Sequence, residues 1–471
     1  MKMKQPDSAA TRKDPFVRFD MKKPPMRQQQ YLRPLLWALT LPNVLLNGSA
    51  ITKEGVEGLK PPFLLLCNHN AFYDFSVATK AIFPARANYV VAIDGFIGRE
   101  WLLRAVGGIC KRKFTNDVQL IRQIRQVFKN GDVLVLYPEA RYSLCGTTAV
   151  LPDSLGKLCR SMGVPVASLI CHGHHVNSPF WNLKKRRVKG MSAEMKLLFT
   201  PEELKNLPLE EINRRIRKAF VYDDFAWQKA RGIRVKAKFR AEGLHRVLYQ
   251  CPACHTEYRM GSKGSELFCE ACGQRWEMTE LGELKAIAGS STSIAKEGSE
   301  DSLVSLSEGS RDSLVPLTEG SGETDPIRPA SHHLMDQETI HIPDWYEWQR
   351  ANVRAEVEAG TYCFSGPCHV DSLPNAKGYI RLGEGTLTHD MNGFHVSGEG
   401  KYSPFSMEIA AKDQYSVHIE YNYLGKHGDC VDLNTLQDTF YTYPHGRDFA
   451  VTKMALATEE LYYHYHPEKV R

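Results

Sequence analysis

The chain has 471 residues, 42% hydrophobic and 24% charged, which is close to ordinary globular usage. At roughly 150 residues per domain it is long enough for about three domains, so a small disulfide-stapled scaffold is excluded. A mean hydropathy of -0.37 is too polar for a chain that crosses a membrane many times. The 60 basic and 54 acidic residues nearly balance, so the net charge of +6 by itself indicates no partner.

Residues 1–30 are rich in Lys, Arg, Pro and Gln and lack the apolar core of a secretory signal. We therefore expect a basic, flexible N-terminus and a reducing, cytosolic setting for the 12 cysteines. The uncharged segment that follows has a solid apolar part at 35–46, which is shorter than the ~20 residues needed to span a bilayer. It is either a helix that contacts a membrane surface, which we favour, or a buried core helix.

Residues 60–170 alternate between apolar strands and helices. Strands are predicted at 63–67, 88–93, 133–137 and 164–170, and helices at 75–83, 116–130 and 154–162. Fully apolar strands that alternate with helices indicate an α/β domain whose largely parallel sheet is covered on both faces.

The first pattern with chemical meaning is Asn-His-Asn-Ala-Phe-Tyr-Asp at 68–74, where the first of these strands gives way to a helix. His69 and Asp74 are five residues apart and can meet only across that turn. A carboxylate on Nδ1 would fix the imidazole tautomer and leave Nε2 to accept a proton. Taken alone, a helix-capping Asp beside an incidental His explains the spacing equally well.

A second pattern, Tyr-Pro-Glu-Ala-Arg at 137–141, follows the strand at 133–137. It lies at the carboxyl edge of the same sheet, where open α/β sheets bind ligands. Arg141 there would be able to clamp a phosphate with two hydrogen bonds. The alternative is that Glu139 and Arg141 brace a loop.

Together, H-x4-D and the later P-E-A-R resemble the lysophospholipid acyltransferase family, whose hallmarks are H-x4-D and P-E-G-[TS]-R. The resemblance covers roughly residues 32–230 and includes Gly-Gly-Ile-Cys-Lys-Arg-Lys at 107–113 and Val-Pro-Val at 164–166, in the family's order. Ala140 stands where the family has Gly, and Arg141 comes one residue early. The arginine of the 107–113 block falls at Lys113 or is shifted to Arg112, which leaves the acceptor headgroup open.

The resemblance implies an acyltransferase domain at 31–246 that includes the membrane-contact segment. His69 would deprotonate the acceptor hydroxyl for direct attack on the acyl thioester, and Asp74 would stabilise the imidazolium. The substrate-binding residues that it implies are Glu139, Arg141, Lys111, Arg112 and Lys113. The donor would be acyl-CoA or acyl carrier protein, and the acceptor a lysophospholipid, above all 1-acyl-sn-glycerol-3-phosphate, which yields phosphatidic acid.

Substrates with long acyl chains are available chiefly at a bilayer. We therefore expect a peripheral or monotopic protein on the cytoplasmic face of an anionic membrane. The basic residues before the apolar segment, Lys22, Lys23, Arg27 and Arg33, and the basic stretch at 211–246 would contact lipid headgroups.

Two Cys-x-x-Cys pairs, fourteen residues apart, predict a structural zinc ribbon at 247–286. Its ligands would be Cys251, Cys254, Cys269 and Cys272. Cys-Pro-Ala-Cys-His at 251–255 also matches the c-type haem attachment pattern, which leaves the second pair unexplained. A zinc ribbon beside a basic stretch is compatible with nucleic-acid binding as well, but aromatic residues are sparse there and no nucleic-acid partner is expected.

Residues 287–333 carry an 11-residue near-repeat rich in Ser, Gly and Glu, which predicts a disordered linker. Residues 334–471 begin with a short helical piece and continue as short strands, with a helix near 454–463. We expect a small β-rich accessory domain, sandwich or barrel, whose role the sequence leaves open. Besides the acyltransferase, two interpretations of the function remain. One is a lipid-binding or scaffold protein without activity on the same fold, and the other, less favoured, is a nucleic-acid-binding protein.

Overall fold

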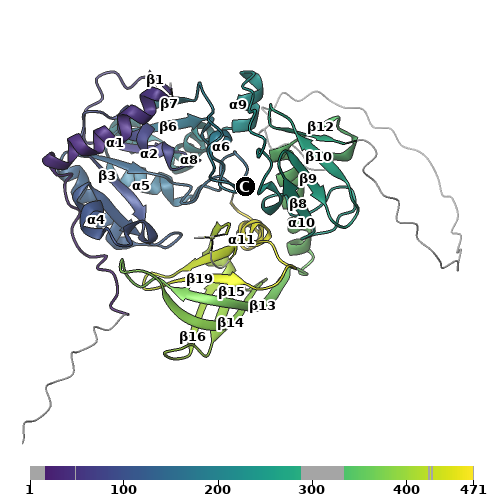
Figure 1. The fold of residues 1–471 in the computed structure, drawn as a ribbon. Helices are drawn as coiled ribbons and strands as arrows, with labels where there is room; N and C mark the ends of the chain where they lie inside the picture. Colours follow the sequence, from purple (N-terminus) through teal and green to yellow (C-terminus); the bar gives the residue numbers. More distant parts are fainter. Residues whose placement is uncertain (1–15, 48, 288–333, 423–424, 426–427, 470–471) are drawn as a thin grey trace, which may run out of the picture.

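The computed structural model describes the chain except for residues 1–15, 48, 288–333, 423–424, 426–427 and 470–471. Figure 1 shows three parts: an α/β domain, a small sheet beside α9 and α10, and a curved sheet with α11. The predicted linker at 287–333 falls almost entirely outside the described residues.

The first domain contains a seven-stranded sheet of order β1-β7-β6-β2-β5-β3-β4. Neighbouring strands are parallel except for β6 and β7, so the predicted α/β class with a largely parallel sheet is confirmed. Its strands are β1 (Ala50–Glu54), β2 (Leu64–Cys67), β3 (Ala87–Ala92), β4 (Gly108–Lys111), β5 (Val133–Leu136), β6 (Val166–His172) and β7 (Ser192–Phe199). Because β2 is buried along its whole length, both of its faces are apolar.

Helices cover both faces of this sheet. One hydrophobic cluster contains Val44 and Val77 from the side of α1 and α2, and the other contains Ile124 and Ile216 from α4 and α8. The helices of this domain are α1 (Arg33–Leu46), α2 (Tyr73–Ala81), α3 (Glu100–Ala105), α4 (Val118–Lys129), α5 (Ser154–Met162), α6 (His174–Asn177), α7 (Pro201–Asn206), α8 (Leu209–Ala219) and α9 (Asp224–Ala230). Short 3₁₀ turns occupy Gln30–Leu32, Ile93–Phe96 and Leu244–Arg246 here, and Leu334–Asp336 and Ala411–Asp413 later.

The described part of the N-terminal segment, from residue 16 onward, packs against the rest of the chain. Phe19 is buried, and its backbone N–H donates to Pro374 O at 2.8 Å. Arg27 forms an ion pair with Asp132 at 2.9 Å. The described residues of the predicted flexible N-terminus, 16–30, are thus packed against both the first domain and the C-terminal domain, and the rest of that range lies outside the described residues.

The second sheet is antiparallel, with the order β12-β11-β10-β9-β8. Its strands are β8 (Met260–Lys263), β9 (Glu266–Cys269), β10 (Arg275–Met278), β11 (Glu283–Ala286) and β12 (Thr339–His341). The strand β12 comes from beyond the 287–333 segment, and α10 (Ile342–Glu358) continues directly from it. Trp345 of α10 packs edge to face on Trp276 of β10 at 4.9 Å, so α10 is anchored on this sheet.

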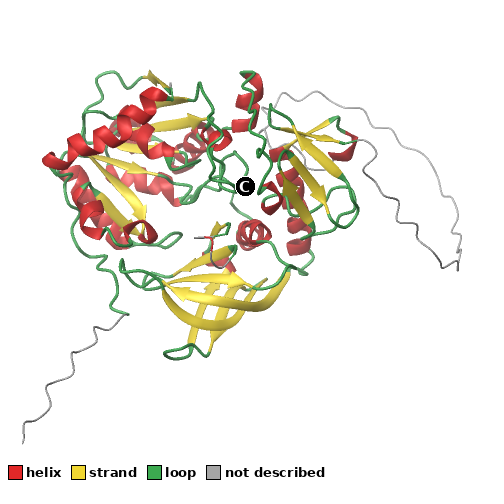
Figure 2. Cartoon of the chain, viewed as in Figure 1, coloured by secondary structure: helices red, strands yellow, loops and turns green. Residues whose placement is uncertain are grey.

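The β-rich region predicted at the C-terminus is confirmed as a seven-stranded antiparallel sheet of order β16-β15-β14-β13-β19-β18-β17. Figure 2 shows how strongly this sheet curves. Its strands are β13 (Cys363–Ser372), β14 (Ile380–Asp390), β15 (Gly393–Gly398), β16 (Phe405–Ala410), β17 (His418–Glu420), β18 (Cys430–Asn434) and β19 (Thr439–Pro444). The last helix, α11 (Val451–Tyr465), packs on α10.

Candidate active site

The turn between β2 and α2 brings His69 and Asp74 together, as their spacing predicts. His69 Nδ1 lies 3.1 Å from Asp74 Oδ2. The same oxygen accepts the backbone N–H groups of Asn70 at 2.6 Å and Ala71 at 2.9 Å. The Asn68 side chain exchanges hydrogen bonds with the backbone of Cys171 at 2.9 and 2.8 Å, which ties the turn to β6.

The environment keeps Asp74 ionised and leaves His69 accessible. Burial raises the pKa of Asp74, but hydrogen bonds from His174 and His69 outweigh it and the pKa falls to about 2. The His69 side chain is 22% exposed, and its ring lies between Tyr137 and Tyr142, with ring centroids 4.3 and 4.2 Å away. Since Nδ1 faces the carboxylate, Nε2 is the nitrogen free to exchange a proton.

His174 is a third member of this group, and the sequence did not indicate it. Its Nδ1 lies 2.5 Å from Asp74 Oδ1, and the ring is fully buried. His174 opens α6 directly after β6, at the sheet edge that carries His69. The one available signal was this position after a predicted strand, because its partner lies 100 residues away in the chain.

Glu139 supports the His69 turn from the neighbouring loop. Its Oε1 accepts the backbone N–H of His69 at 3.1 Å, and its Oε2 accepts that of Ala149 at 2.9 Å. Burial raises the pKa of Glu139 to about 8, although both backbone hydrogen bonds oppose the shift. Ala140, which stands in place of the family's glycine, has a φ of 54°, in the left-handed region that favours glycine.

Arg141 is buried, with 4% exposed. Its Nη2 donates to Glu459 Oε1 of α11 at 2.5 Å. Its Nε and Nη1 make no hydrogen bond to any residue that the structure describes, although the Tyr346 phenol interacts with the guanidinium. Burial lowers the pKa of Arg141, but the neighbouring Glu459 carboxylate outweighs it and the pKa is raised.

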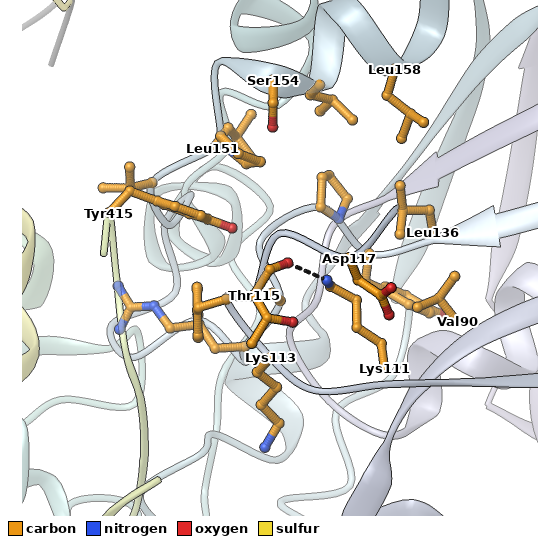
Figure 3. Close-up of a pocket in the computed structure, with 18 of the residues that line it drawn as sticks. Val90, Lys111, Lys113, Thr115, Asp117, Leu136, Leu151, Ser154, Leu158 and Tyr415 are labelled. Atoms are coloured by element: carbon orange, nitrogen blue, oxygen red, sulfur yellow. Dashed lines mark hydrogen bonds between the residues drawn. The ribbon is translucent and has the colours of Figure 1, made fainter. Parts of the chain in front are cut away.

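The three basic residues at the end of β4 point in different directions. Lys111 Nζ donates to Thr115 O at 2.7 Å, as Figure 3 shows, and Lys113 Nζ pairs with Asp432 at 2.8 Å and Asp94 at 3.7 Å. Arg112, on the opposite face of the strand, donates to Leu373 O and Pro374 O, both at 3.1 Å.

A cavity of about 1450 Å³, here called the central cavity, brings part of this site together. Four of the predicted site residues line it: His69, Lys111, Lys113 and Arg141. Asp74, Glu139 and Arg112 are not among the lining residues. Apolar side chains also line the cavity, among them Val90, Leu136, Leu151 and Leu158, which Figure 3 labels. Residues of the C-terminal domain, such as Tyr415, complete the lining, so the cavity lies between two domains.

The four cysteines of the predicted ribbon form a compact cluster whose Sγ atoms all lie within 4.8 Å of one another. Cys251 and Cys272 are 3.8 Å apart, and Cys254 and Cys269 are 3.7 Å apart. With Zn–S bonds of about 2.3 Å, a tetrahedral site has S–S edges of about 3.8 Å. The geometry and the donor set therefore both fit a zinc ion.

Residues 49–172 match the family model described as Acyltransferase. The predicted resemblance is confirmed over this stretch, which contains His69, Asp74, the 107–113 block and Arg141. Among solved structures, the chain is similar to the 1-acyl-sn-glycerophosphate (LPA) acyltransferase PlsC from Thermotoga maritima. Sequence identity is 18% and the TM-score 0.33, over 41% of this chain and 77% of that chain. No curated protein sequence matches the chain.

Proposed function

We propose that the protein transfers a fatty acyl group from an acyl thioester to the free hydroxyl of a lysophospholipid. The observation that carries this proposal is the His69–Asp74 pair, whose His69 lines a cavity of about 1450 Å³ and which lies within the region that matches the acyltransferase family. Our preferred acceptor is 1-acyl-sn-glycerol-3-phosphate, with phosphatidic acid as product.

The proposed reaction needs no covalent enzyme intermediate. His69 Nε2 takes the proton of the acceptor hydroxyl while the hydroxyl oxygen attacks the thioester carbonyl. When the tetrahedral adduct collapses, the C–S bond breaks and the imidazolium returns its proton to the departing thiolate. Asp74 stabilises the imidazolium through Nδ1, and general-base catalysis of this kind contributes about 10²–10⁴ in rate.

The cations and the apolar wall of the central cavity support a phosphate-bearing lipid as substrate. Arg141 lines the cavity, and two of its nitrogens make no hydrogen bond to a described residue. Lys111, whose Nζ donates to Thr115 O, lines the same cavity. We assign the acceptor phosphate to these two side chains. Leu136, Leu151 and Leu158 would accommodate part of an acyl chain.

An acyl-transfer assay tests the proposal directly. Purified protein would be given labelled acyl-CoA or acyl carrier protein with a panel of lysolipids that includes lysophosphatidate and monoacylglycerol. We expect His69→Ala to abolish transfer, and His395→Ala, an exposed imidazole of the C-terminal domain, to retain it. Wild-type protein that binds lysolipid without turnover would instead favour the lipid-binding reading.

We further propose that α1 holds the protein on the cytoplasmic face of a membrane. Its buried side chains, Leu36, Thr40 and Val44, follow one face, whereas Leu39 and Leu46 on the opposite face are 70% and 87% exposed. No helix in the described part of the chain is long and apolar enough to cross a bilayer. A helix with one apolar face exposed suits attachment within the interface.

The cysteine cluster is proposed to bind one structural Zn²⁺. A closed shell of four thiolates leaves no position for a substrate, so the ion would stabilise the fold and take no part in acyl transfer.

A further inference from the structure

The C-terminal domain forms part of the wall of the central cavity. Tyr415, His418 and Glu420 line it from the region of β17, and Tyr462 and Tyr463 line it from α11. All of these residues lie outside the stretch that matches the acyltransferase family. Substrate in the cavity would therefore touch residues that the family motifs do not contain.

The firmest link between this domain and the predicted site is the pair formed by Arg141 and Glu459. Glu459 is fully buried on α11, and its Oε1 accepts from Arg141 Nη2 at 2.5 Å and from Ser416 Oγ at 2.8 Å. Its Oε2 accepts from Arg350 Nη1 at 2.7 Å. Both carboxylate oxygens are thus engaged, so Glu459 itself is held firmly in place.

This arrangement fixes one edge of the Arg141 guanidinium and leaves another available. A guanidinium is a planar fork, so a bond from Nη2 to a fixed carboxylate restricts the direction of the other nitrogens. Nε and Nη1 are buried and have no hydrogen bond of ordinary geometry to a described residue, although the Tyr346 phenol interacts with the guanidinium. Buried donors of a charged group are costly to leave unpaired, and an anion that entered the cavity would satisfy them.

We infer that Glu459 is a positioning residue for the acceptor site, because it orients Arg141 so that Nε and Nη1 receive the phosphate of a lysophospholipid. The inference rests on the proposed function and assigns the C-terminal domain a part in acceptor selection. An acceptor with a phosphate monoester gains from the oriented guanidinium, whereas a neutral acceptor does not.

The opposite role for Glu459 is that of a competitor, whose carboxylate occupies Arg141 in place of the phosphate. The two roles predict changes of opposite sign when the carboxylate is removed. Loss of a positioning residue weakens phosphate binding, whereas loss of a competitor strengthens it.

The test compares Glu459→Gln with Glu460→Gln. Glu460 is the next residue of α11 and is 2% exposed, and its ion pairs are with Arg354 at 2.8 Å and Arg350 at 3.6 Å. We expect the ratio of kcat/KM for lysophosphatidate to that for monoacylglycerol to fall about tenfold in Glu459→Gln and to stay near the wild-type ratio in Glu460→Gln. Calorimetric titration with glycerol 3-phosphate should likewise show weaker binding in Glu459→Gln alone.

An unchanged ratio in Glu459→Gln, or tighter binding of glycerol 3-phosphate, would overturn the inference. If Glu459→Gln does not fold, Ser416→Ala decides, because it removes one of the bonds that hold Glu459 and should lower the same ratio. A wild-type ratio in Ser416→Ala would then reject the positioning role. Absence of acyl transfer in the wild-type protein would reject the proposed function instead, while the titration would still report on Glu459.

Discussion

The Asp74 carboxylate forms hydrogen bonds with two imidazoles and accepts hydrogen bonds from two backbone N–H groups. The distances are 3.1 Å to His69, 2.5 Å to His174, and 2.6 and 2.9 Å to the backbone nitrogens of Asn70 and Ala71. These four contacts determine which ring nitrogens of His69 and His174 face the carboxylate. The charge on Asp74 therefore controls both the orientation of the proposed base and the local fold.

Asp74→Asn should lower kcat by about two to four orders of magnitude, because an amide cannot stabilise the His69 imidazolium and can favour the wrong tautomer. Steady-state kinetics on purified protein would measure this loss. An Asp74→Asn enzyme with wild-type kcat would show that His69 does not act as a base supported by this carboxylate.

The same residue predicts a pH dependence of stability. The pKa of Asp74 is lowered from 3.8 to about 2 in the folded protein, so its ionised form contributes about 2 kcal/mol of stability above pH 4. That contribution is lost as the pH falls from about 4 to 2. Denaturant unfolding at several pH values should show a steeper acid loss for the wild type than for Asp74→Asn. Equal slopes would contradict the role of Asp74.

Ala140→Gly should stabilise the protein. A left-handed φ costs a residue with a Cβ about 1–2 kcal/mol, and glycine adds about 0.4–1 kcal/mol of unfolded-state entropy, so the net gain is about 0.5–1 kcal/mol. Ala241→Gly is the matched control, since Ala241 is buried and is not among the residues of positive φ, and it should destabilise. Denaturant unfolding of both variants measures the difference, and a loss of stability in Ala140→Gly would contradict the strain argument.

At the residue scale, the sequence predicted contacts that lie within one turn and missed those that span the fold. His69 and Asp74 were predicted to meet because five residues and one strand-to-helix boundary separate them. The partners of Arg141 and Asp74, Glu459 and His174, lie 318 and 100 residues away. No local pattern encodes such distances, because they depend on how the domains pack.

At the scale of elements, hydrophobic pattern and capping residues were sufficient for most of the first domain. The helix predicted at 154–162 has those bounds, and α4 begins at Val118 because the Asp117 side chain accepts from Gln119 N at 2.8 Å and Leu120 N at 3.2 Å. In the C-terminal domain the sequence predicted short strands without their bounds. Gly366 and Pro367 interrupt the pattern of β13. Strand β14 is longer than the short strands expected there, and its glycines weaken the strand signal.

The cysteine cluster gives a prediction for the second sheet. Metal analysis should find about one zinc per chain, and Cys251→Ser should lower the melting temperature, because the ligands hold the loops that precede β8 and follow β9. Cys363→Ser is the matched control, since Cys363 is exposed and lies outside the cluster, and it should leave the melting temperature unchanged. Finding iron or haem, or equal melting temperatures for the two variants, would refute a structural zinc site.

At the scale of the whole molecule, buried polar contacts join the first domain to the C-terminal domain, beside apolar clusters that contain residues of both. Arg112 donates to Leu373 O and Pro374 O, Lys113 pairs with Asp432, and Arg141 pairs with Glu459. These bonds join the basic residues of the predicted phosphate site to the C-terminal domain. Separation of the two domains would expose the apolar clusters that they share, so they are expected to stay associated during turnover.

The proposed attachment of the whole molecule to a membrane can be tested on α1. Leu39 and Leu46 project from the exposed face of the helix, and burying a leucine side chain contributes about 1.5–3 kcal/mol. Leu39→Glu with Leu46→Glu should therefore reduce sedimentation with vesicles that contain phosphatidylglycerol by at least about tenfold in partition coefficient. The basic stretch at 211–246 contributes less to membrane binding than its charge suggests, because Arg214 and Arg215 pair with Glu211 and Arg240 pairs with Glu277.

Leu436→Glu, at an exposed leucine of the C-terminal domain, is the control and should sediment as the wild type does. Transfer to a water-soluble, short-chain lysolipid should persist in the double variant, because the substitutions lie outside the central cavity. A double variant that sediments like the wild type would place the attachment to the membrane elsewhere on the molecule.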